Sequence, residues 1–194
     1  MSNQIFKVAL LSTALISAYA SAEDNAAGGT INFSGAITDT TCTINGGKSA
    51  DFTVALNPIS VQDAGTTTGP IVKNKKTIAL TFSGCTPAEG TSGAPLKIYF
   101  SSAQNISNDG KYLINDTVNE NDDTVARNVG FSLASPGSST PIQLNKPFET
   151  GIMGDKTAPD SETLTMDVYY YKTNAQAAKV GDLSSNLTYT ISYL

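Results

Sequence analysis

The stretch that decides the fold is the C-terminal sequence LTYTISYL, residues 187–194. Apolar and hydroxyl residues alternate along it, so that one face carries Leu187, Tyr189, Ile191 and Tyr193. Strict alternation of this kind is typical of a β-strand with one face buried and the other in solvent. The last residues of a chain usually fray unless the fold holds them. We therefore expect residues 187–194 to form a strand with one apolar face, beside which no later segment of the sequence can pair.

Short alternating segments recur upstream of this strand, separated by runs of Gly, Pro, Asn and Asp. These turn residues favour tight connections, and residues 173–181 are expected to form a loop before the last strand. Roughly eight or nine short strands predict an all-β sandwich or barrel with Greek-key connections, in a single domain. The strands expected upstream of residue 187 span residues 51–61, 76–85, 95–102, 128–135, 140–145 and 162–173.

The N-terminal segment is predicted to be a signal peptide. Lys7 precedes an apolar run over residues 8–20 that is too short to cross a bilayer. The Ala-Ser-Ala triplet at 20–22 fits the small-residue rule for cleavage before Glu23, and a cut two residues earlier is the near alternative. We therefore expect residues 1–22 to be removed and the mature chain to be exported.

Charge and cysteine content limit the partners and indicate the redox compartment. The chain carries 12 basic and 17 acidic side chains, a balance that disfavours nucleic acid as a partner. It has two cysteines, Cys42 and Cys85, and in an exported protein two cysteines predict one disulfide. Free or metal-binding thiols are the weaker alternative, because no other Cys and no His is present to complete a metal site.

The absence of histidine excludes several catalytic classes. Ser-His-Asp and Cys-His nucleophilic systems need an imidazole, and so do histidine-based metal sites. The acids between Asp116 and Asp123 leave a carboxylate-pair glycosidase as one possibility, although solvated turns are the commoner role of such loops. The stretch NENDDT (119–124) lacks the central Gly and distal Glu of a calcium loop. We expect no enzyme activity, no cofactor and no metal.

The leader sequence GGTINFSGAITDTTC, residues 28–42, contains a second isolated alternating strand. Its apolar face carries Ile31, Phe33, Gly35 and Ile37. Gly35 stands where a core strand normally has a large residue, so we expect another group to approach it closely. A leader strand without a neighbour and a terminal strand without a neighbour together suggest that subunits exchange strands, since exposed strand edges are normally blocked.

At this point the chain resembles the structural subunits of chaperone–usher, type 1-like fimbriae, and specifically a major pilin. The resemblance extends over the whole mature chain, with a longer segment before Gly181 and a variable loop over 103–127 as departures. The matching features are the leader with Gly35, LTFSGC ending at Cys85, NVGFSL (128–133), VYYYKT (168–173), Gly181 and the penultimate Tyr193.

The resemblance implies an incomplete immunoglobulin-like β-sandwich that lacks its final strand and is completed by a donor strand from another subunit. Residues 23–38 would be the donor-strand extension and residues 39–194 the pilin domain. Identical or related pilins, a periplasmic chaperone and an outer-membrane usher would be the partners, and the protein would reach the surface fimbrium through the periplasm. The acceptor groove and chaperone-binding strand would include Gly181, Leu187, Tyr189, Ile191 and Tyr193.

Two other interpretations of the function are compatible with the sequence. The chain could be a minor adaptor or initiating pilin of the same system, because the strands of such subunits look alike. A protein of a different class, a secreted monomeric carbohydrate-binding sandwich, would need a solvent-facing aromatic platform or a metal site, and the chain has no Trp.

Overall fold

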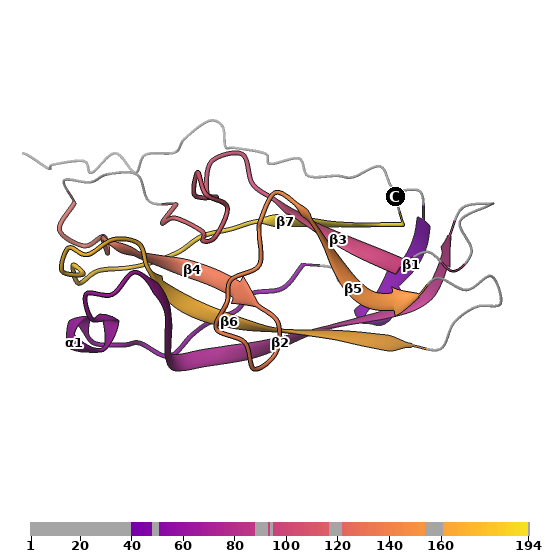
Figure 1. Cartoon of the computed structure of the whole chain (residues 1–194), viewed down its shortest axis with the longest axis horizontal. Coiled ribbons are helices and arrows are strands. Elements are labelled where there is room, and N and C mark those ends of the chain that lie inside the picture. Colours follow the sequence, from indigo (N-terminus) through magenta and orange to yellow (C-terminus); the bar gives the residue numbers. More distant parts are fainter. Residues whose placement is uncertain are drawn as a thin grey trace, which may run out of the picture. The chain divides into compact units, whose positions relative to one another are not determined.

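The computed structural model describes residues 40–47, 51–87, 93, 95–116, 122–153 and 161–193, all within a unit that spans residues 34–194. The predicted signal peptide and donor strand therefore lie outside the described residues. Figure 1 shows seven strands in the described part of the chain. They are β1 (Thr40–Ile44), β2 (Gly69–Pro87), β3 (Pro95–Ser101), β4 (Val129–Ala134), β5 (Pro147–Met153), β6 (Glu162–Lys172) and β7 (Thr188–Ser192).

The strands form two antiparallel sheets. One sheet has the order β1-β2-β6-β4, and the other has the order β5-β3-β7. Alternation places Leu80 and Phe82 of β2 in the core, and Leu96, Ile98 and Phe100 of β3 are equally buried. The two apolar faces meet in one hydrophobic core, and the predicted all-β fold with two packed sheets is confirmed. Within the described residues, no helix is long and apolar enough to span a membrane.

The pairing of the long strand β2 is irregular over the segment that carries its lysines. Its pairing with β6 jumps between Ile71 and Lys76, and Asn74 adopts a positive φ of 58° inside the intervening segment. An extra stretch in one strand bends it and turns side chains in new directions. The amide of Asn74 donates to the carbonyls of Asn57 and Pro58, and Lys76 donates to the carbonyl of Ala55.

Two of the expected strands are wrong. Residues 51–60 are irregular, and Val61–Ala64 form the short helix α1, whose Ser60 cap bonds reciprocally with Asp63. A Ser cap two residues after Pro58 favours a helix start over a continuing strand. Residues 140–145 contribute only a single bridge, between Pro141 and Ala134.

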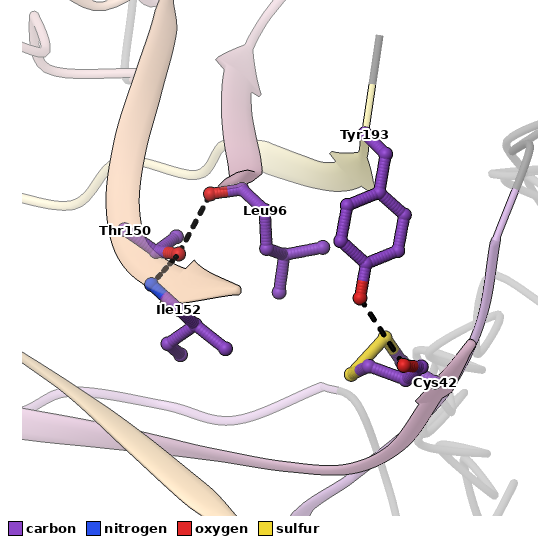
Figure 2. The surroundings of a disulfide bond; sticks show 6 residues. Cys42, Leu96, Thr150, Ile152 and Tyr193 are labelled. Atoms are coloured by element: carbon purple, nitrogen blue, oxygen red, sulfur yellow. Dashed lines mark hydrogen bonds between the residues drawn. A yellow bond between two sulfur atoms is a disulfide. The ribbon is translucent and has the colours of Figure 1, made fainter. Parts of the chain in front are cut away.

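Strand β5 was not predicted, although its pattern was present in the sequence. Phe148, Thr150 and Ile152 alternate along it, but Pro147 at its start and Gly151 within it are typical turn residues. Thr150 Oγ1 donates to the carbonyl of Leu96 at 2.7 Å and accepts from the Ile152 N–H at 3.1 Å (Figure 2). This edge strand therefore depends on a side-chain bond to β3 as well as on main-chain pairing.

The predicted disulfide is confirmed and joins the first two strands. Cys42 of β1 is bonded to Cys85 of β2, and Cys85 is almost fully buried. Strand β1 pairs with β2 alone among the described strands. The bond therefore fixes an edge strand that has a single pairing partner.

Candidate functional site: an apolar groove beside strand β7

An apolar groove of ≈ 490 Å³ opens between the two sheets. Its floor comes largely from the four-stranded sheet, and its two sides are residues 51–56 and 185–189. Most of the partly buried apolar residues that pack on the core line this groove, so the core is left unfinished there. The apolar residues of the lining are Ile44, Phe52, Val54, Leu56, Ile78, Leu80, Phe100, Leu113, Phe131, Leu133, Val168, Leu187 and Tyr189.

Strand β7 forms one side of the groove. It pairs with β3 from Thr188 opposite Ser101 to Ser192 opposite Lys97. On its other edge no strand pairs with it in the part of the chain that the structure describes.

The opposite side of the groove is the irregular segment 51–56. No main-chain hydrogen bond joins residues 52–56 to another described residue. The ring of Phe52 reaches across to Tyr189, with the ring centroids 6.4 Å apart and tilted by 56°. Phe52 is 46% exposed although it is a large apolar residue, so this contact does not close the groove.

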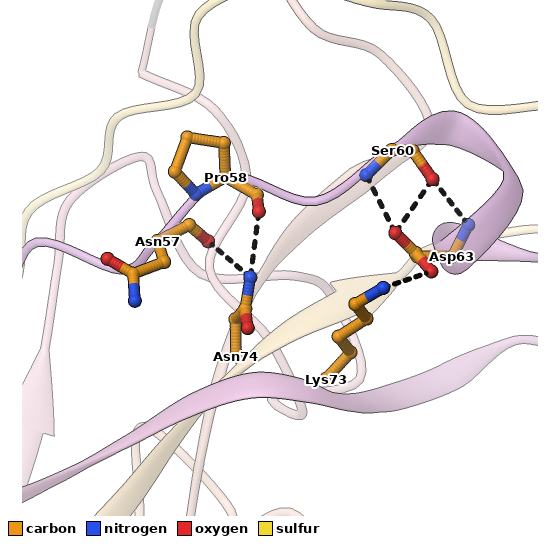
Figure 3. Close-up of polar contacts among 6 residues, drawn as sticks. All are labelled: Asn57, Pro58, Ser60, Asp63, Lys73 and Asn74. Atoms are coloured by element: carbon orange, nitrogen blue, oxygen red, sulfur yellow. Dashed lines mark hydrogen bonds and ion pairs between the residues drawn. The ribbon is translucent and has the colours of Figure 1, made fainter.

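Side chains of β2 hold the far end of this segment (Figure 3), and Tyr170 of β6 adds a further bond. Asn74 binds the carbonyl of Pro58 at 2.7 Å, and the Tyr170 hydroxyl donates to the carbonyl of Asn57 at 3.3 Å. Lys73 pairs with Asp63 at 2.8 Å in the first turn of α1. These bonds fix the segment at Asn57 and beyond, and on the groove side Lys76 donates to the carbonyl of Ala55 at 3.3 Å.

The predicted residues of the last strand divide between the groove and the core. Leu187 and Tyr189 line the groove. Ile191 and Tyr193 lie on the same face but are buried, 7% and 4% exposed. The Tyr193 hydroxyl donates to the carbonyl of Cys85 at 3.3 Å, beside the disulfide (Figure 2). The C-terminal end of the chain is thereby tied to the first two strands.

Gly181 lies away from the groove. A Cβ added to it would lie 2.3 Å from the Val125 carbonyl carbon and 2.4 Å from the Ala126 nitrogen. Real side chains do not approach a backbone this closely, so the close packing of two loops requires a glycine here. The role of Gly181 is therefore to let loop 173–187 pack against residues 124–126 before β7 begins.

Few polar residues line the groove. Burial raises the pKa of the Tyr189 hydroxyl, and the carboxylate of Asp51 adds to this effect. Ser185, Asn186 and Thr188 are the main polar residues at this side. Within the described residues no cluster of His, Cys, Asp or Glu could hold a metal ion. A groove of this kind suits an extended apolar segment rather than an ionic ligand.

The sequence alone did not identify residues 51–56 as the second side of the groove. The alternation of Val54 and Leu56 was taken to indicate a sheet strand, whereas these side chains line the groove. The same pattern fits either role, because an extended segment beside a groove also buries every second side chain. Phe131 and Val168 were expected in strands but not at the groove floor.

Comparisons with known proteins agree with this architecture. The model of the Fimbrial protein family matches residues 31–194. The major fimbrial subunit SMF-1 of Stenotrophomonas maltophilia (strain K279a) is 30% identical over 176 residues, which cover 87% of this chain and 94% of that protein.

A solved structure of a chaperone–usher pilus shares the fold. A subunit in a chaperone–usher pilus structure concerned with rod uncoiling has a TM-score of 0.58 at 16% identity, covering 86% of this chain and 96% of that one. The P pilus rod subunit PapA has a TM-score of 0.46 at 16% identity, covering 86% of this chain and 100% of that one. The sandwich thus has the immunoglobulin-like fold of chaperone–usher pilins, and the chain belongs to the fimbrial protein family.

Proposed function

We propose that this protein is the major structural subunit of an adhesive surface fimbria and polymerises by donor-strand exchange. The segment from about Thr30 to Thr38 of one subunit would occupy the apolar groove of the next. The observation that carries the proposal is the groove itself, which lies beside the edge of β7 that no described strand pairs with. The family is one of structural pilus subunits, which also supports a non-enzymatic role.

The length and pattern of the leader fit the groove. Nine residues at about 3.3 Å each span roughly 30 Å in extended form. Ile31, Phe33 and Ile37 would enter the groove on one face of the strand, each adding roughly 1.5–3 kcal/mol through burial. Main-chain pairing would contribute a net 0.5–1.5 kcal/mol or so for each hydrogen bond. Such strand addition to a sheet edge is a recognised binding mode, for which chaperone–pilin complexes are a standard example.

Gly35 would set the register of the donor strand. A strand shifted by one residue turns every apolar side chain to the wrong face, so register must be fixed. A glycine within the alternating set would fit where the groove is shallow. Before assembly, a periplasmic chaperone would supply the missing strand to β7, and an outer-membrane usher would exchange it for the next leader.

The central test is to compare the full chain with a variant lacking residues 23–38 downstream of an intact signal peptide. We expect the full chain to form fibres that resist heating in detergent. The shortened chain should bind the chaperone and form none. A shortened chain that folds alone as a stable monomer, with every sheet edge occupied, would contradict the proposal.

A point variant tests the register within the same experiment. Gly35→Leu should leave the subunit folded on its chaperone but should abolish fibre formation, because the added side chain would collide with the groove floor. Gly29→Leu is the matched control, since it lies in the leader but outside the proposed donor strand. Normal fibres from the Gly35 variant would refute the role of this glycine.

A minor adaptor or initiating pilin is the second candidate within the family. The likeness to a major fimbrial subunit over most of both chains favours the major role. Fibre stoichiometry would separate the two, because a major subunit should account for most of the shaft mass. A secreted monomeric carbohydrate-binding sandwich would instead remain soluble and monomeric with the leader present.

A further inference from the structure

A second hollow, of ≈ 840 Å³, lies outside the groove and is walled by three loops. Most of its lining residues have polar or charged side chains, and they come from residues 104–115, 125–129 and 173–179. Main-chain bonds hold the loops together, because the Asp116 N–H donates to Ser184 at 2.9 Å and the Ala126 N–H donates to Asp182 at 3.0 Å. The hollow is therefore a fixed feature of the sandwich rather than a gap between loose segments.

The single arginine of the chain, Arg127, lines this hollow. Its Nε is buried and has no hydrogen-bond acceptor, and among the described residues its side chain has no ion-pair partner. A buried donor without a partner is costly, and the cost is greater for a charged group. Because Nε is buried, a ligand in the hollow would have to bind the terminal nitrogens of this guanidinium, and a ligand with its own negative charge suits them.

Lys179 faces Arg127 across an antiparallel bridge. The main chains of the two residues exchange hydrogen bonds of 3.4 and 3.1 Å. Like charges opposite each other destabilise such a pair. Lys179 is compensated by Asp123 at 2.8 Å, and the pKa of this exposed carboxyl is lowered chiefly by Lys179 and further by Arg127. The carboxyl of Asp122 also interacts with Lys179, which lowers its pKa further. Lys179 is therefore compensated, and Arg127 is the cation of the hollow that has no ion-pair partner among the described residues.

The remaining lining groups favour a sugar over a simple anion. Gln104 and Gln176 present amides with no side-chain hydrogen bond to described residues, and such amides bind hydroxyl groups in both directions. The Tyr112 ring is held rigidly by stacking on Tyr171, with centroids 4.7 Å apart and planes at 15°. A fixed aromatic ring and a few convergent polar groups are what a saccharide pocket of this volume requires.

We propose that this hollow binds a carboxylate-bearing saccharide, with the Arg127 guanidinium as the partner of the carboxylate. Arginine matches a carboxylate with two parallel hydrogen bonds, which gives selectivity for the acidic sugar over its neutral analogue. Gln104 and Gln176 would bind the hydroxyl groups, and Tyr112 would contact the ring. The site goes beyond the proposed structural role, because it would let the shaft itself attach to acidic glycans.

The test measures binding of sialyllactose and of an oligogalacturonate to purified fimbriae, with lactose as the neutral probe. We expect both acidic sugars to bind in the micromolar to millimolar range and lactose to bind at least tenfold more weakly. Arg127→Gln should reduce acidic-sugar binding roughly ten- to hundredfold, the range expected for a hydrogen bond to a charged group. Lys146→Gln is the matched control, since it removes the same charge from an exposed site outside the hollow.

A second variant keeps the test decisive if Arg127→Gln fails to assemble. Gln104→Ala removes an exposed side chain, so it should leave fibre yield unchanged and should weaken binding severalfold. The proposal is overturned if neither acidic sugar binds at millimolar concentration. It is equally overturned if lactose binds as well as sialyllactose, or if the Lys146 variant loses as much binding as the Arg127 variant.

Discussion

At the scale of single residues, the buried charge of Asp167 is the most consequential polar feature. Its carboxylate is almost fully buried in β6 and accepts from Lys75 at 2.6 Å, Thr77 at 2.6 Å and the Gly137 N–H at 3.0 Å. The bond from Lys75 is the largest cause that lowers the pKa of this carboxyl to about 2. Because every oxygen is bonded, the charge is stable within the sheet.

We predict that Asp167→Asn lowers the free energy of unfolding at neutral pH by roughly 1–2 kcal/mol. A carboxyl whose pKa is depressed on folding contributes stability above its unfolded pKa, and that stability is lost as the pH falls toward about 2. The difference between wild type and variant should therefore shrink between pH 4 and pH 2. The measurement is urea unfolding at each pH. It uses a chain with residues 30–38 copied onto its C-terminus, so that the proposed donor strand can fill the groove of the same molecule.

The control is Glu149→Gln, which removes an exposed acid of β5. It should change the unfolding free energy little at any pH. A difference between wild type and Asp167→Asn that stays constant down to pH 2 would contradict the assignment of the charge to this site.

At the scale of elements, strand β1 depends on its covalent link more than the other strands do. It is five residues long and, among the described strands, pairs with β2 alone, with a register shift between Thr41 and Thr43. A short strand with one partner contributes few main-chain bonds. The Cys42–Cys85 disulfide lies at this irregular point and compensates for the interrupted pairing.

We predict that the double variant Cys42→Ala/Cys85→Ala loses roughly 4 kcal/mol of unfolding free energy, because the disulfide closes a long loop in the unfolded chain. Urea unfolding under oxidising and reducing conditions provides the measurement. Reduction of the wild-type protein should reproduce the loss, and the variant should not respond to the reductant. Equal midpoints for all four samples would show that the bond has no stabilising role.

The elements also show what the sequence could predict. Strands β3, β4 and β6 follow from alternation, because both their faces and their turn boundaries are local properties of the sequence. Segment 51–60 could not be assigned in this way, since its apolar residues face a groove formed by distant strands. The side chains that fix it, Asn74 and Tyr170, lie far away in sequence. Long-range contacts of this kind decide whether an alternating segment joins a sheet.

At the scale of the whole molecule, most of the partly exposed side chains that pack on the core of the described sandwich lie along the groove. The alternating segments near the two ends of the chain favour an incomplete sandwich, which stays a prediction. The polar hollow around Arg127 was not predicted, since its walls come from three loops whose sequences show no motif. Periodicity identifies strands, whereas a pocket built from loops appears only in the folded chain.

We predict that a synthetic peptide of residues 30–38 raises the melting temperature of the subunit lacking residues 23–38. Filling the groove would complete the core and pair the edge of β7, so the shift should grow with peptide concentration. A peptide with Gly35→Leu should have a much smaller effect. Thermal unfolding followed by circular dichroism measures the shift, and equal shifts from both peptides would contradict a register-specific site.

The link between Cys42 and Cys85 has a mechanical consequence for a fibre assembled as proposed. Strand β1 begins at Thr40, just after the proposed donor-strand extension of residues 23–38, so a pulling force transmitted from the neighbouring subunit would enter the fold at β1. Two residues into that strand the load would pass through a covalent bond into the long central strand β2. The filament would then bear tension without separation of β1 from β2. Extension under flow would instead take place at the contacts between subunits.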